Sequence, residues 1–159
     1  MKGRALVVTV STRAAAGVYP DLSGPAVGEE LAAAGWNVDR PIVVPDGDAV
    51  EAALRAAVAD AYDLVLTTGG TGLGPDDLTP EATARVADRL APGLAELVRA
   101  SGIESGVATA VLSRGIAGIA GRTLIVNLPG SVGGARDGVR ALLPVLGHAV
   151  DQLRGGDHR

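Results

Sequence analysis

Short aliphatic runs alternate along this chain with longer, alanine-rich segments of helical periodicity. The runs lie at residues 4–12, 36–45, 63–68 and 122–130. Strands that alternate with helices of this length form βαβ units, which build a mostly parallel sheet. The pattern therefore predicts a doubly wound α/β fold. We expect a single domain over residues 1–154 and a disordered tail at 155–159, because no linker, repeat or low-complexity tract interrupts the chain.

The helices are expected at residues 23–35, 46–62, 80–101 and 134–153. Ser23 is a candidate N-cap and Gly35 a stop for the first of them. Pro92 should break or kink the third, and Pro41 places the second strand toward a sheet edge. Residues 13–21 are expected to form a loop, and residues 108–121 give a mixed signal.

Composition excludes several classes of function. The chain has no cysteine, which rules out disulfides, thiolate metal sites and cysteine nucleophiles and is compatible with the cytoplasm. Its only lysine is Lys2, so a phosphate-binding or Schiff-base lysine is not expected. A net charge of −4 and few aromatic residues argue against nucleic-acid binding. No apolar run reaches the roughly 18 residues of a membrane helix, and the N-terminal residues predict no signal peptide.

Three loops rich in glycine, proline or aspartate follow predicted strands. They read "VPDGD" (44–48), "TTGGTGLGPDD" (67–77) and "NLPGSVGG" (127–134). Ligands of open α/β sheets bind beyond the carboxyl ends of the strands, and in a parallel sheet these three loops share that end. We therefore expect the functional site where they meet.

The glycine loop at 67–77 matches neither common phosphate motif. No Gly-Lys-Ser/Thr follows its glycines, and Pro75 stands where a dinucleotide fingerprint needs its third glycine. The glycines still allow a ligand to approach the backbone N–H groups. Thr79, Pro80 and Glu81 fit the N-cap, first and early acidic positions of a helix, whose start favours an anion.

Two aspartates, Asp76 and Asp77, sit beside this expected anion site. Carboxylates repel phosphate, and a Mg²⁺ ion between them would remove the conflict, because Mg²⁺ binds one or two carboxylates together with substrate phosphates. The alternative is that both are turn residues that favour the helix dipole. Similarly, Asp48 is interpreted as a capping residue, and Ser131 either caps the last helix or offers its amide to a phosphate.

Other polar residues carry less weight. His148 falls within a predicted helix and is interpreted as structural. The arginines nearest to predicted loops are interpreted as solvated surface charges, and they are Arg13, Arg114, Arg122 and Arg136.

Seven ordered segments together resemble the molybdopterin adenylyltransferase family, which includes MogA, MoaB and the G domains of Cnx and gephyrin. The segments are "VST" (10–12), "AGVYPDLSGP" (16–25), "VPD" (44–46), "LTTGGTG" (66–72), "DLTPEAT" (77–83), "LSRGIAGIAGRTLIVNLPGS" (112–131) and "LLPVLGHAVDQL" (142–153). They span nearly the whole chain. A single "GGTG" would be weak evidence for this family, whereas seven segments in the family's order and at compatible spacing are specific evidence for it.

The resemblance implies a three-layer α/β/α protein that assembles as a homotrimer. It implies transfer of AMP from Mg-ATP to molybdopterin with release of pyrophosphate, followed by use of the product by a molybdate-insertion enzyme. The family's two critical aspartates fall on Asp46 and Asp77, which are assigned to catalysis and to Mg²⁺. The implied substrate-binding residues are Ser11, Thr67, Thr68, Gly69, Gly70, Thr71, Gly72, Asn127, Pro129, Gly130 and Ser131.

The chain also departs from the family pattern. Many relatives have an aspartate where this chain has Thr12, an arginine where it has Asp76, and a basic residue where Val132 follows Ser131. Two positive charges are thus missing from a site for polyanions. Two alternatives follow: a non-catalytic molybdopterin-binding protein of the same fold, or a nucleotide pyrophosphatase like the CinA family, which "GPDDLTPEA" (74–82) also resembles.

Overall fold

The computed structural model describes residues 2–156 of the 159-residue chain. Its strands are β1 (Arg4–Val10), β2 (Asn37–Val38), β3 (Ile42–Val44), β4 (Leu64–Thr68), β5 (Arg89–Leu90), β6 (Ala117–Ala120) and β7 (Thr123–Leu128). Its helices are α1 (Thr12–Ala15), α2 (Ser23–Ala33), α3 (Asp48–Ala59), α4 (Thr79–Val86), α5 (Pro92–Glu104), the 3₁₀ helix η1 (Ala108–Leu112) and α6 (Val132–Leu153).

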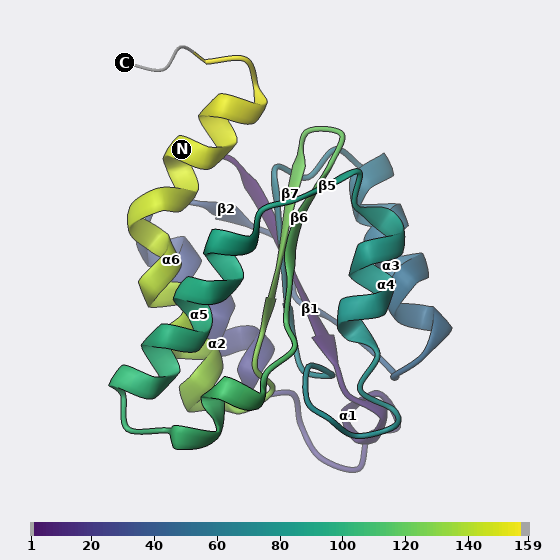
Figure 1. Ribbon diagram of the computed structural model, residues 1–159. Coiled ribbons are helices and arrows are strands. Elements are labelled where there is room, and N and C mark those ends of the chain that lie inside the picture. Colours follow the sequence, from purple (N-terminus) through teal and green to yellow (C-terminus); the bar gives the residue numbers. More distant parts are fainter. Residues whose placement is uncertain (1, 157–159) are drawn as a thin grey trace.

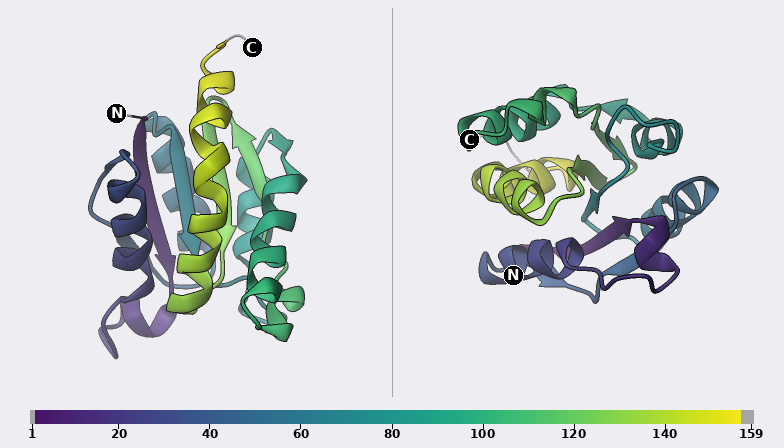
Figure 2. Two further views of the ribbon diagram at one scale, coloured as in Figure 1. Left: turned by 90° about the vertical axis from the view of Figure 1, so that its left-hand side faces the viewer. Right: turned by 90° about the horizontal axis from the view of Figure 1, so that it is seen from below.

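All seven described strands join one sheet in the order β2-β1-β4-β7-β6-β5, and β3 also pairs with β1. Strands β1, β2, β3, β4 and β7 run parallel, whereas β6 is antiparallel to both β7 and β5. Helices α2, α5 and α6 cover one face of the sheet, and α3 and α4 cover the other (Figures 1 and 2). The predicted three-layer, doubly wound and mostly parallel fold is confirmed.

The central strands are buried on both faces, which explains their continuous aliphatic character. Along β4, Leu64 and Leu66 belong to the core beneath α2, α5 and α6, whereas Val65 belongs to the core beneath α3 and α4. Along β7, Ile125 likewise faces the opposite core from its neighbours. Successive side chains of a strand point to opposite faces, so each run fills two cores at once.

Two predicted elements differ at the start of the chain. The expected loop after β1 contains the short helix α1, which Ser11 caps by accepting a hydrogen bond from the Ala14 amide at 3.2 Å. The expected strand at 36–45 is divided at Pro41 into β2 and β3, which pair with opposite ends of β1. Ser23 begins α2 without capping it, and Asp21 accepts from the Gly24 amide at 3.0 Å instead.

The predicted helix at 80–101 is two helices with a strand between them. Helix α4 ends at Val86, and the chain then extends to form β5 beside β6. Pro92 occupies the first position of α5, where its missing N–H costs no hydrogen bond. Residues 108–121, whose sequence predicted neither a helix nor a strand clearly, form η1 followed by β6.

The last helix, α6, ends at Leu153, and Gly155 follows with φ +86°. Residues 157–159 of the predicted tail lie outside the described residues, so the boundary at 154 stays a prediction. His148 on α6 lies 2.8 Å from the Gln152 amide nitrogen through its Nε2 atom. No helix between residues 2 and 156 has the length and apolar character needed to cross a membrane.

Candidate active site

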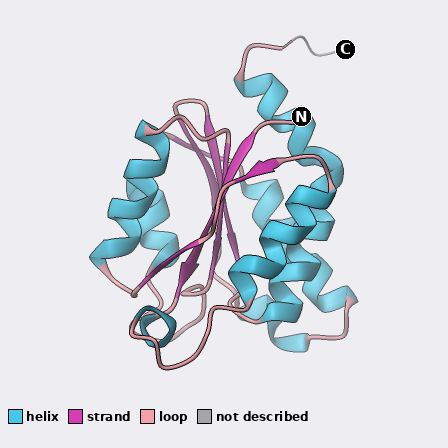
Figure 3. Ribbon diagram, turned by 180° about the vertical axis from the view of Figure 1, so that it is seen from behind, coloured by secondary structure: helices cyan, strands magenta, loops and turns pink. Residues whose placement is uncertain are grey.

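The three predicted loops converge at the end of the sheet that carries α1 (Figure 3). Three adjoining hollows open there, of about 380, 240 and 530 Å³, and Gly130 lines all of them. The loop after β7 therefore stands at the centre of the site, with the glycine loop after β4 beside it.

Glycine is required where the loop after β4 begins. Gly69 has φ +102°, and a Cβ there would lie 2.3 Å from the Val10 carbonyl oxygen. Gly70 has φ +67°, and its Cβ would lie 2.2 Å from the Thr79 hydroxyl. A Cβ on Gly130 would lie 3.2 Å from the Cα of Gly69, so the two loops pack backbone to backbone.

Asp46 is fixed at this end of the sheet by Thr12. The Thr12 hydroxyl donates to Asp46 Oδ2 at 2.7 Å, its amide donates to the same oxygen at 3.3 Å, and the Asp46 amide donates to the Thr12 hydroxyl at 3.1 Å. Asp46 Oδ1 faces Gly70 and accepts no hydrogen bond from the described residues. One carboxylate oxygen is thus held and the other is presented to the site.

Asp77 closes the far end of the glycine loop. Its Oδ2 accepts from the Gly74 amide at 2.9 Å, and its own amide donates to the Gly74 carbonyl at 3.1 Å. Asp77 lines both the 380 Å³ cavity and the 530 Å³ hollow, and the hollow also contains Asp46, Asp76 and Arg13. Both predicted critical aspartates therefore lie in one hollow.

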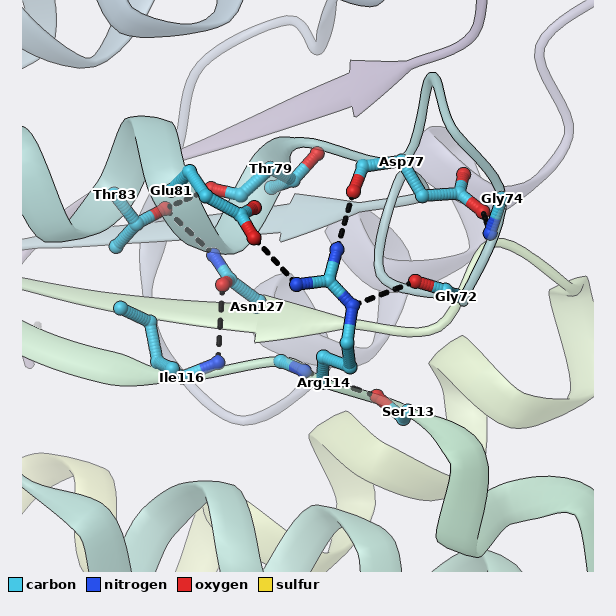
Figure 4. Close-up of polar contacts among 11 residues, drawn as sticks. Gly72, Gly74, Asp77, Thr79, Glu81, Thr83, Ser113, Arg114, Ile116 and Asn127 are labelled. Atoms are coloured by element: carbon cyan, nitrogen blue, oxygen red, sulfur yellow. Dashed lines mark hydrogen bonds and ion pairs between the residues drawn. The ribbon is translucent and has the colours of Figure 1, made fainter.

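Arg114 was interpreted from the sequence as a solvated surface charge, and that interpretation is wrong, because its guanidinium binds the glycine loop. Its guanidinium donates to the Gly72 carbonyl at 2.9 Å, to the Asp77 carbonyl and to Glu81 (Figure 4). Its amide donates to the Thr71 carbonyl at 2.8 Å. It thereby ties both ends of the glycine loop to the start of α4. Its position in "LSRGIAG" carried no chemical signal by itself.

The Arg114–Glu81 pair shifts both acid–base equilibria. The hydrogen bond from Arg114 lowers the pKa of Glu81 below its ordinary value, although partial desolvation opposes the shift. The pKa of Arg114 is raised, first by the hydrogen bond to Glu81. The pair therefore stays ionised, and Glu81, which lies in the first turn of α4 as predicted, also holds Arg114 beside the glycine loop.

Several predicted substrate-binding side chains lie in the interior. Asn127 donates to the hydroxyls of Thr67 and Thr83 at 3.0 Å each and accepts from the Ile116 amide at 3.1 Å. Thr68 donates to the Pro129 carbonyl at 2.7 Å. Asn127 is 2% exposed and both Thr67 and Thr68 are 0% exposed, so these side chains support the loops from below.

The remaining predicted residues line the hollows. The predicted backbone positions Gly70, Thr71, Gly72, Pro129 and Gly130 all border the 380 Å³ cavity. Ser131 also lines it and caps α6 by accepting from the Gly134 amide at 3.1 Å, which confirms the capping alternative without removing its amide from the site. Ser11 lines the 240 Å³ hollow and lies 3.0 Å from the Tyr19 hydroxyl.

Thr79 does not cap α4 as predicted, because the helix begins at Thr79 itself and Leu78 occupies the cap position. The Thr79 hydroxyl is buried against Gly70 and has no hydrogen-bond partner among the described residues. Of the other predicted arginines, Arg136 faces Glu29 and Glu30 at 3.7 Å, and Arg122 lines a hollow at the opposite end of the sheet.

The described residues contain no group of three or more His, Cys, Asp or Glu side chains that could hold a metal ion alone. Asp46 and Asp77 in one hollow nevertheless fit Mg²⁺, which takes one or two carboxylates and completes its shell with substrate oxygens and water. The unpaired Asp46 Oδ1 is a suitable oxygen ligand of that kind.

The family described as "Probable molybdopterin binding domain" matches residues 6–148, which include every loop of this site. The chain belongs to this family. It is 42% identical over 154 residues to a molybdopterin adenylyltransferase of Helicobacter pylori strain J99, covering 94% of this chain and 86% of that protein. A molybdopterin biosynthesis protein from Mycobacterium abscessus has 46% identity and a TM-score of 0.93, with 98% of each chain covered.

This molybdopterin-binding family also occurs within longer proteins. The chain is 35% identical over 156 residues to a molybdenum cofactor biosynthesis bifunctional protein of Chlorobaculum tepidum. That match covers 98% of this chain and 50% of the bifunctional protein. The domain described above therefore corresponds to about half of that protein.

Proposed function

We propose that this protein is a molybdopterin adenylyltransferase of molybdenum cofactor biosynthesis. The observation that carries the proposal is the meeting of Asp46, Asp77 and the glycine loop around Gly130, beside a cavity of about 380 Å³. Its support is the 42% identity to a molybdopterin adenylyltransferase across nearly the whole chain.

In the proposed reaction, an oxygen of the molybdopterin phosphate attacks the α-phosphorus of ATP. The bond from that phosphorus to the bridging oxygen breaks, and pyrophosphate leaves with the electron pair. No protein nucleophile is needed, so this chain's contribution is positioning and charge stabilisation. Backbone N–H groups of the glycine loop orient the phosphates, and Asp46 and Asp77 would hold the cation whose positive charge balances those phosphates. Mg²⁺, when bound by these carboxylates, would neutralise the triphosphate and the leaving pyrophosphate.

The wider context is part of the proposal. The family resemblance implies a molybdate-insertion enzyme as the partner that receives the adenylylated pterin, and a bifunctional protein of molybdenum cofactor biosynthesis matches this chain over about half of its length. A homotrimeric assembly and a cytoplasmic location rest on the family resemblance and on the absence of cysteine.

The test is adenylyl transfer by the purified protein with molybdopterin and Mg-ATP. Asp77→Asn and Asp46→Asn should each lower the rate by about a hundredfold or more, because each weakens the site for the cation that would stabilise the reacting phosphates, and losing one such electrostatic stabiliser usually costs about that much. Asp48→Asn is the matched control, because Asp48 is exposed in the first turn of α3 and makes no side-chain hydrogen bond within residues 2–156.

Three results would distinguish the alternatives. Formation of adenylylated pterin by the wild type, and its loss in the two aspartate variants, would support the proposed enzyme. Tight pterin binding without product would favour a non-catalytic binding protein. Release of AMP to water without pterin would favour a nucleotide pyrophosphatase.

A further inference from the structure

The 380 Å³ cavity has one cation in a largely apolar wall. The glycine loop and the Pro129–Ser131 turn form one side, and α5 with η1 forms the other. Among its lining residues only Arg99 and Asp77 carry charge. Arg99 projects from α5, and nothing in the sequence marks it out from other helix-surface arginines.

Arg99 differs from every other described arginine. Seven of them form ion pairs with carboxylates: Arg4, Arg55, Arg85, Arg114, Arg136, Arg140 and Arg154. The described arginines without an ion pair are Arg13, Arg40, Arg89, Arg99 and Arg122. Of these five, Arg99 alone is half-buried, and the other four are exposed to water. A cation that is partly withdrawn from water without a counter-charge is unfavourable, so a negatively charged group beside Arg99 would be stabilising.

The guanidinium is nevertheless held in place. Its Nη1 donates to the Gly115 carbonyl at 2.7 Å and to the Ser113 carbonyl at 3.3 Å, on either side of Arg114. Neither Nε nor Nη2 has an acceptor among the described residues. A guanidinium has five N–H donors in a rigid plane, so three remain for a ligand.

An anion with several oxygens matches these donors. Arginine binds phosphate through paired N–H groups, and its charge roughly doubles the strength of each hydrogen bond. The first turn of α6, with Ser131 and Gly134 on the same cavity, adds the positive end of a 22-residue helix. The negative charge of Asp77 disfavours an anion in the cavity, but its Oδ2 atom already accepts a hydrogen bond from the Gly74 amide.

We propose that Arg99 binds the phosphate of a substrate in this cavity. The proposal rests on the proposed function and adds a ligand-contacting residue to it. Arg99 supplies, from α5, positive charge that this chain lacks at Val132, directly after the Pro129–Ser131 turn. The ligand class is a phosphate monoester or polyphosphate, carried by either the nucleotide or the pterin.

The test is equilibrium binding of pyrophosphate, ATP and molybdopterin, each with magnesium, to the full chain and its variants. Arg99→Met keeps the side-chain length and removes the charge, and it should weaken binding of pyrophosphate and of at least one substrate by about ten- to a hundredfold. Arg99→Lys should recover part of the affinity. Arg122→Met, an exposed arginine at the other end of the sheet, should bind all three as the wild type does.

Comparison of the three ligands shows which substrate carries the phosphate that Arg99 binds. Of the two substrates, weaker binding of ATP alone assigns Arg99 to the nucleotide, and weaker binding of molybdopterin alone assigns it to the pterin. Wild-type affinity for all three ligands in a folded Arg99→Met protein would overturn the inference. If that variant does not fold, unchanged affinities in Arg99→Lys, which cannot bind two oxygens in parallel, overturn it instead. Wild-type protein that binds none of the ligands overturns it too.

Activity separates this inference from the proposed function. Adenylyl transfer with an unchanged KM in Arg99→Met would contradict the inference alone, whereas binding that depends on Arg99 without any adenylyl transfer would contradict the proposed function alone.

Discussion

Replacement of Gly69 by alanine should destabilise the protein through two separate costs. Its φ of +102° is a conformation that alanine avoids, at roughly 1–3 kcal/mol. The added Cβ would also lie 2.3 Å from the Val10 carbonyl oxygen, which belongs to a central strand and cannot move cheaply. Forcing an extra methyl group into packed structure adds about 1–3 kcal/mol. The total for Gly69→Ala is therefore about 2–6 kcal/mol.

Gly35→Ala is the matched control for this variant. Gly35 has a similar φ of +95°, but a Cβ there would meet no atom within 4 Å. It should lose only the conformational cost of about 1–3 kcal/mol. The two variants differ by the collision cost of about 1–3 kcal/mol, so at about 2–4 °C per kcal/mol for a protein of this size Gly69→Ala should melt about 2–12 °C below Gly35→Ala in a thermal scan. Equal melting temperatures would refute the collision and with it the close packing of the glycine loop on β1.

Three further perturbations test the site. In Arg114→Lys the single ammonium group cannot bind all three oxygens that the guanidinium binds, so the glycine loop should be misplaced and kcat should fall about ten- to a hundredfold. The control is Arg55→Lys on α3, whose kcat should match that of the wild type. Thr12→Val should lower adenylyl transfer because it releases Asp46, and Thr12→Ser should restore it; equal rates in both would contradict that role. The pKa of Glu81 is lowered from 4.5, so its contribution to stability is present above pH 4.5 and is lost as pH falls through the lowered value. Urea unfolding at pH 3 to 7 should show this loss in the wild type and less of it in Glu81→Gln.

The layers of the fold were predictable because the aliphatic runs at 4–12, 63–68 and 122–130 each contain a strand that is buried on both faces. The errors lie where tertiary contacts decide the local structure. Residues 80–101 carry helical periodicity throughout, yet pairing with β6 draws residues 89–90 into a strand. No local signal marks that pairing, because its partner lies about thirty residues further along the chain.

The site was predictable at the level of loops and less so at the level of side chains. The parallel sheet brings Asp46 and Asp77 to one hollow, as the strand-end argument required. Asn127 follows the same logic in sequence, but its side chain points into the interior and bonds to Thr67. Arg99 and Arg114 could not be separated from surface arginines, since their roles depend on carbonyl groups that only the folded chain brings within reach.

The central claim is that this site transfers AMP to molybdopterin. The measurement that tests it most directly follows the label from ATP carrying ³²P in its α-phosphate, with molybdopterin and Mg²⁺ present. The account predicts that the label enters the pterin, with one pyrophosphate released for each adenylylated pterin formed, and that Asp77→Asn slows both by about a hundredfold or more. Label found only in free AMP, or retained entirely in ATP while molybdopterin stays bound, would contradict it.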